Sequence, residues 1–111
     1  MSNHILIFTT VPDENQAHKI SEVLVTERLV ACATVGSPCQ SFYWWQGSIT
    51  QDKEHLLILK TRESLYSDVE SRLLKIHPYQ VPEIIAIPIV MGSEKYLNWI
   101  TEETLRNEVE E

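Results

Sequence analysis

The sequence contains no apolar run that approaches the roughly 20 residues needed to cross a bilayer. Its first residues, MSNHILIFTTVPDE, include an apolar core of only four residues and no basic segment before it, so they lack the pattern of a secretory signal. We therefore expect a cytoplasmic protein that has no membrane partner.

Basic residues are also few. The 111 residues include 9 Lys and Arg against 16 Asp and Glu, which gives a net charge of −7. Sequence-independent binding to phosphate backbones needs clustered Lys and Arg, so we expect no nucleic-acid partner. Proline and glycine number only five and three while 43% of the residues are hydrophobic, a composition typical of a folded chain. The length suits a single domain over residues 1–111 with a modest core.

Cysteine is scarce, since Cys32 and Cys39 are the only two. Two cysteines do not form a disulfide framework. On one extended strand, their seven steps of about 3.3 Å would separate them by roughly 23 Å, which is too far for a bond within one chain. We expect buried thiols that serve packing, because no base or cation that would activate Cys32 is visible in the sequence. Cys39 is in addition a candidate ligand for a soft metal ion.

Motifs of catalysis are missing as well. The sequence has no Ser-His-Asp constellation, no glycine-rich phosphate loop and no HExxH motif, so nothing in it predicts an enzyme. His4, His18 and His55 have no partner at metal-ligand spacing, and we expect them to be exposed polar residues.

What the sequence does contain is a stretch, residues 31–61, that predicts one long β-ribbon around which the rest of the chain packs. Gly36-Ser37-Pro38 favours a bulge in its first strand, and Gln46-Gly47-Ser48 is the natural reversal because Gly47 can take a positive φ. Side chains from residue 41 to 49 alternate between two faces. Both faces are apolar, with Tyr43, Trp45 and Ile49 on one and Phe42 and Trp44 on the other.

A ribbon with two apolar faces needs a second covering surface, because a sheet in a small domain buries one face and leaves the other in water. A chain this short is not expected to supply that surface, whereas another copy of the chain could. We therefore predict self-association through an interface that contains Phe42, Tyr43, Trp44, Trp45 and Ile49. The alternative is a hairpin folded wholly into its own core.

The segments on either side of the ribbon predict two further strands and three helices. Residues 5–10 favour a fully buried strand, and Asp13 is an N-cap for the first helix. The second helix opens with residues 62–64 and ends at His77-Pro78. Residues 83–90 form a last strand, a third helix starts at residues 92–93, and the acidic end, residues 102–111, is solvated. The inward stripes of the helices are Ala17, Ile20, Val23 and Leu24, then Leu65, Val69, Leu73 and Ile76, then Tyr96, Leu97, Ile100 and Leu105.

This order of elements is the ferredoxin-like βαββαβ plan of an α+β protein, with an extended β-hairpin and a C-terminal helix added. The helices cover one face of an antiparallel sheet, and the ribbon's first strand and the final strand lie at opposite edges, where Pro88 is tolerated. A long apolar edge is an aggregation hazard unless it is paired. A closed oligomer would pair it.

Short motifs occur in a fixed order along nearly the whole chain: Thr10 with Pro12-Asp13-Glu14, Ala31-Cys32-Ala33, Ser41, Tyr43, Trp45, Gly47 and Ile49, Glu54, Lys60-Thr61, His77-Pro78-Tyr79, Pro82-Glu83, Tyr96 and Trp99-Ile100. Together they resemble the CutA family of divalent-cation tolerance proteins. The resemblance implies a ferredoxin-like fold, a homotrimer held by the long ribbon, an architecture similar to that of PII signalling proteins, and a role in tolerance to copper and other divalent cations.

The resemblance also suggests a metal ligand. Copper ligands proposed for a bacterial member include a first-strand cysteine and a His-His pair before Pro-Tyr, and the corresponding positions here are Thr9 and Ile76-His77. Only His77 remains of that set, and neutral imidazole suits copper, nickel and zinc, so His77 is the candidate ligand. The alternative is a loop histidine bonded to the backbone next to Pro78.

A cleft between subunits is a second implication of the resemblance, lined by Trp45, Glu54, Lys60, Tyr79 and Trp99. The alternative is that Lys60 and Glu54 pair across the ribbon while the aromatic residues form interface core. We expect a non-catalytic homotrimer that binds copper or other divalent metal ions in the response to metal. The rivals are a PII-like sensor that binds a small ligand between subunits near Lys60 and Tyr79, and a trimeric scaffold for another protein.

Overall fold

The computed structural model of the protein describes residues 3–105. In chain order its elements are β1 (His4–Val11), α1 (Glu14–Thr26), β2 (Cys32–Trp45), β3 (Ser48–Arg62), the 3₁₀ turn η1 (Glu63–Leu65), α2 (Tyr66–Ile76), β4 (Ile85–Pro88) and α3 (Glu94–Glu103). The strands form one antiparallel sheet in the order β2-β3-β1-β4. This confirms the ferredoxin-like α+β prediction, with β2 at one edge and the strand that carries Pro88 at the other.

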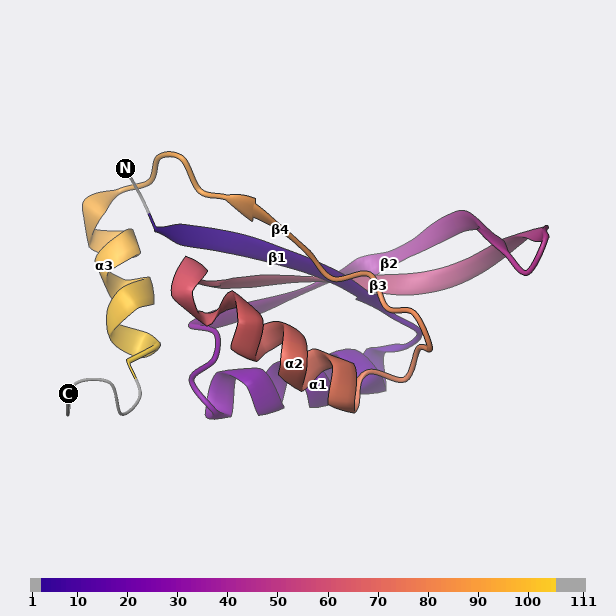
Figure 1. Cartoon of the computed structure of the whole chain (residues 1–111), viewed down its shortest axis with the longest axis horizontal. Helices are drawn as coiled ribbons and strands as arrows, with labels where there is room; N and C mark the ends of the chain where they lie inside the picture. The colour runs from indigo at the N-terminus through magenta and orange to yellow at the C-terminus, as the bar shows by residue number, and fades with distance from the viewer. Residues whose placement is uncertain (1–2, 106–111) are drawn as a thin grey trace.

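Two helices cover one face of the sheet, while α3 stands at the end where β1 begins (Figure 1). Helices α1 and α2 are joined at one end by Arg72, whose guanidinium lies 2.8 Å from the carboxylate of Glu27. Between these helices and the sheet lies the core, which is built from Ile7, Val11, Ile20, Leu24, Leu57, Leu59, Val69 and Leu73. Within residues 3–105, no helix combines the length and the hydropathy needed to span a bilayer.

Strand β1 is buried on one face rather than on both, so the prediction of a fully buried strand is wrong. Its odd-numbered residues, from Ile5 to Val11, point into the core, whereas its even-numbered residues are only half-buried. The reason is that α1 and α2 lie on the same face of the sheet and leave the other face without a helical layer.

Helix α1 begins where its sequence predicts, whereas α2 begins at Tyr66, later than the predicted residues 62–64, because residues 63–65 form the 3₁₀ turn η1. The Asp13 carboxylate accepts a hydrogen bond from the Gln16 amide at 2.8 Å and caps α1. Helix α2 ends at His77, whose backbone is extended, because Pro78 follows. The predicted stripes point inward, with Val23 and Ile76 half-buried at their margins and the other members buried.

The ribbon is formed by β2 and β3, which turn at Gln46 and Gly47 with φ of 51° and 83°. Its register shifts between Val35 and Pro38, where a bulge was predicted. Because the turn has two residues, Trp44 lies opposite Ile49. Cross-strand partners share a face, so Ile49 lies with Phe42 and Trp44, and its predicted place beside Tyr43 and Trp45 is wrong.

The outer half of this ribbon projects away from the helices (Figure 1). Phe42 is 66% exposed, Trp44 72% and Ile49 65%. The alternative of a hairpin folded wholly into its own core is therefore wrong for a single chain, which leaves these side chains without a cover.

The C-terminal part differs from its prediction in two details. Strand β4 is shorter than residues 83–90, and Tyr96 is 42% exposed rather than inward, whereas Ile100 of α3 is buried. Ser93 caps α3 by accepting from the Tyr96 amide at 3.2 Å, and the acidic end beyond residue 105 lies outside the described residues.

Two of the three histidines that were predicted to be exposed are less exposed than expected. His18 is exposed as predicted, but His4 and His55 are half-buried. The His4 ring lies 2.8 Å from the hydroxyl of Thr101, and the His55 ring lies 3.2 Å from the carbonyl oxygen of Gly36. Both therefore serve local structure, at α3 and at the bulge.

Truncation of Leu57 tests the core. Its side chain is fully buried between the sheet and the helices, so Leu57→Ala should lower the free energy of unfolding by about 2–5 kcal/mol. Leu74→Ala, on the exposed side of α2, is the matched control and should change it by less than about 0.5 kcal/mol. Urea unfolding at a fixed protein concentration measures both. Equal effects would contradict the placement of Leu57 in the core.

Candidate functional site

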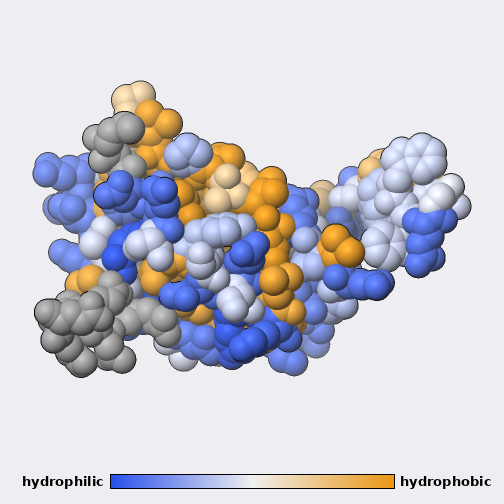
Figure 2. Space-filling model, viewed as in Figure 1, coloured by the Kyte–Doolittle hydropathy of each residue, from blue (hydrophilic) through white to orange (hydrophobic). Residues whose placement is uncertain are grey.

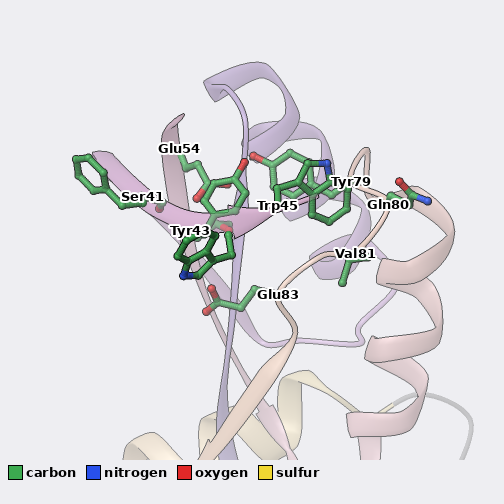
Figure 3. A pocket seen from close by; sticks show the side chains of 11 residues that line it. Ser41, Tyr43, Trp45, Glu54, Tyr79, Gln80, Val81 and Glu83 are labelled. Carbon is green, nitrogen blue, oxygen red and sulfur yellow. The ribbon is translucent and has the colours of Figure 1, made fainter. Parts of the chain in front are cut away.

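A hollow of about 650 Å³ lies where the ribbon leaves the core and meets the loop after α2. Its walls come from the end of β1, from β2 and β3, and from the segment between α2 and β4, so residues far apart in sequence face one another across it (Figure 3). The lining residues are Thr10, Ser41, Phe42, Tyr43, Trp44, Trp45, Glu54, Tyr79, Gln80, Val81 and Glu83. Among the residues predicted for the cleft, it brings together Trp45, Glu54 and Tyr79.

Glu54 is the buried charge of this site, with only 6% of its surface exposed. The Tyr79 hydroxyl donates a hydrogen bond of 2.6 Å to its carboxylate. Burial of the phenol and this bond to Glu54 raise the pKa of Tyr79 far above its usual value. Tyr79 therefore stays a hydrogen-bond donor throughout the physiological pH range.

Nearer the tip of the ribbon, Tyr43 forms a second hydrogen bond from a phenol to a carboxylate. Its hydroxyl donates to the carboxylate of Asp52 on β3. This hydrogen bond is the main cause that raises the pKa of Tyr43. The site thus pairs two phenols with two carboxylates.

His77 holds the loop that carries Tyr79. Its Nδ1 accepts from the Tyr79 amide at 3.1 Å, so its Nε2 carries the proton and donates to the carbonyl oxygen of Thr10 at 2.9 Å. Burial lowers the pKa of His77, which favours the neutral ring. Both ring nitrogens therefore have backbone partners, and a metal ion at His77 would have to displace one of them.

Lys60 and Trp99, the remaining residues predicted for the cleft, lie at the other end of the sheet. The Lys60 ammonium is 5.9 Å from the centroid of the Tyr96 ring, which stacks on Trp99 with the ring centroids 5.5 Å apart. Six steps along β3 put Lys60 about 20 Å from Glu54. The proposed pairing of Lys60 with Glu54 is therefore wrong within one chain.

The cysteines are less buried than predicted. Cys32 is half-buried and Cys39 is exposed, and both are free thiols. Cys39 lies beyond the bulge, where no helix covers the ribbon, and its thiol donates to the backbone oxygen of Glu54 at 3.3 Å. Lys60 lies opposite Cys32 in the ladder, with its ammonium 3.9 Å from the sulfur. This cation is far from Cys32 in sequence, so only the register of the ribbon could have revealed it.

Among residues 3–105, no group of three or more His, Cys, Asp or Glu side chains is placed to hold a metal ion. Sequence reasoning also missed the contribution of Thr10, Tyr43 and Glu83 to the hollow. Their only signal was position, since Thr10 and Tyr43 lie near the ends of β1 and β2 and Glu83 lies in the segment between α2 and β4.

Known proteins provide an independent comparison. A family model described as CutA1 divalent ion tolerance protein matches residues 5–103. The divalent-cation tolerance protein CutA of Pyrococcus horikoshii is 46% identical over 100 residues, which cover 90% of this chain and 97% of that protein. Its counterpart in Thermus thermophilus is 41% identical over 99 residues, which cover 89% of this chain and 96% of that protein.

Solved structures agree with the sequence comparison. The crystal structure of CutA from Xylella fastidiosa superimposes with a TM-score of 0.90 at 43% identity and covers 93% of this chain and 99% of that one. Since the family model and these relatives span nearly its whole length, the chain belongs to the CutA1 divalent ion tolerance protein family.

Proposed function

We propose that this protein contributes to the tolerance of divalent cations as a closed homotrimer that binds copper or another divalent metal ion and catalyses no reaction. Family membership over residues 5–103 is the observation that carries this proposal. The net charge of −7 agrees with it, because an acidic surface attracts cations. The cytoplasmic location stays a prediction.

Association is supported by the surfaces that a single chain leaves uncovered. The outer edges of β2 and β4 lack a strand partner within the described chain. Hydrophobic residues gather over β4 and the segments that flank it (Figure 2), where Ile85, Ile87 and Val90 are exposed. Pairing the β2 edge of one copy with the β4 edge of the next would repeat head to tail, and such a contact forms a ring when its rotation returns to the first copy.

The proposed cleft requires two copies. Trp45, Glu54 and Tyr79 form one group in the chain, and Lys60 and Trp99 form another at the far end of the sheet. A neighbouring copy could bring the second group beside the first. For the metal ion, His77 and Cys39 stay the predicted ligands, and His77 would become available if the Tyr79 amide turned away from its Nδ1.

A PII-like sensor is the second candidate, favoured by the hollow beside Tyr79. Its volume of about 650 Å³ falls in the range of small-molecule sites, roughly 300–1,000 Å³. Thermal-shift screening against nucleotides and carboxylic acids separates this candidate from the first, since a ligand that binds only the folded protein raises its melting temperature.

Disruption of the exposed ribbon face tests the trimer. Sedimentation equilibrium of the unaltered protein at micromolar concentration should give the mass of three chains. The double variant F42E/W44E should give the mass of one chain, because buried carboxylates would repel across the interface. Leu74→Glu, on the exposed side of α2, adds charge elsewhere and should leave the assembly intact. A single-chain mass for the unaltered protein would refute the trimer.

Copper calorimetry tests the metal ligand. Metal-free protein should bind Cu²⁺ with a saturable isotherm, and His77→Ala should weaken binding about tenfold or more, since imidazole is a preferred copper ligand. His18→Ala, on the exposed face of α1, should match the unaltered protein. Circular dichroism would confirm that His77→Ala remains folded. Identical isotherms for both variants would remove His77 from the site.

A further inference from the structure

The hollow contains a buried carboxylate that lacks a cation. Glu54 is 6% exposed, and the Tyr79 hydroxyl is the neutral donor that contacts its side chain. Within the part of the chain that the structure describes, no Lys or Arg forms an ion pair with it. A buried carboxylate is costly without an opposite charge, and one neutral hydrogen bond offsets only part of that cost.

The surrounding walls favour a positive charge. The charged residues among those that line the hollow are Glu54 and Glu83, and no Lys, Arg or His is among them. Asp52 adds a further negative charge behind Tyr43. The remaining wall is largely aromatic, and aromatic faces attract cations, most strongly where water is excluded. An anionic ligand would meet like charges here.

We propose that this hollow binds an organic cation, a small ligand with an ammonium group, whose charge lies beside Glu54 and whose carbon atoms contact the rings of Tyr43, Trp45 and Tyr79. These three side chains reach the hollow from the ribbon and from the loop after α2 (Figure 3). Such a site goes beyond metal tolerance, because an ammonium group needs neither a free imidazole nitrogen nor a set of several ligating side chains.

The occupant that we infer is a ligand from solution, even where a neighbouring copy places its Lys60 beside this hollow, because the contacts of that lysine lie within its own chain. Lys60, which lies on the face of the sheet that α1 and α2 leave bare, already contacts the ring of Tyr96 and the sulfur of Cys32 within its own chain. The hollow is also far larger than one ammonium group, at about 650 Å³. It therefore has room for a cation that carries several carbon atoms.

Tetramethylammonium chloride and tert-butanol provide the test, because they are similar in size and differ in charge. The full-length protein is titrated with each in buffer that contains EDTA, and tryptophan fluorescence and calorimetry follow binding. Tetramethylammonium should bind saturably and at least about tenfold more tightly than tert-butanol, the difference expected for a desolvated cation on aromatic rings.

Glu54→Gln isolates the charge. Glutamine keeps an acceptor for the Tyr79 hydroxyl, so the fold should persist while affinity for tetramethylammonium falls at least about tenfold. Glu22→Gln, on the exposed face of α1, removes an equal charge and should leave binding unchanged.

Three results would overturn the proposal. Equal binding of both probes would make the hollow merely apolar, and no binding of either would remove the site. Binding of tetramethylammonium only after Lys60→Ala would assign the hollow to a neighbouring copy's lysine. Because EDTA removes metal ions, these outcomes are independent of the copper measurement.

Discussion

The antiparallel pairing of β2 with β3 is the constraint on which the remaining structure depends. In its inner half, Leu57 and Leu59 of β3 enter the core opposite Val35 and Ala33 of β2. Beyond the bulge after Val35, the same two strands continue past the helices as the exposed ribbon. One ladder therefore both anchors the core and sets the direction of an aromatic surface that the core cannot cover.

Glu54 lies at the transition between these halves, opposite Cys39. Its burial depends on the loop after α2, which Pro78 separates from the helix. His77 fixes that loop through the Thr10 backbone and the Tyr79 amide, and Tyr79 in turn contacts Glu54. The carboxylate is thus held in place by a series of neutral hydrogen bonds that starts at the end of a helix, and these bonds offset part of the cost of its burial.

Local signals predicted most of the fold, and long-range register explains what they missed. Capping by Asp13 and the turn at Gly47 depend on neighbouring residues, and both are present as predicted. The face of Ile49 depends on the length of the turn, because a two-residue turn pairs odd with even positions. The hollow joins segments of three strands and a loop, so no single pattern in the sequence could have outlined it, and only Trp45, Glu54 and Tyr79 were anticipated.

Register also divides the ribbon into two faces with different environments. Phe42, Trp44 and Ile49 share one face and are each about two-thirds exposed, whereas Tyr43 and Trp45 on the other face are both 38% exposed. The first face has nothing in its own chain to cover it, which is the condition for contact with another copy. The second face leans towards Glu54 and Tyr79. Phe42 and Trp44 also line the hollow, so the surface for assembly and the surface for binding share residues, and a change in one is expected to affect the other.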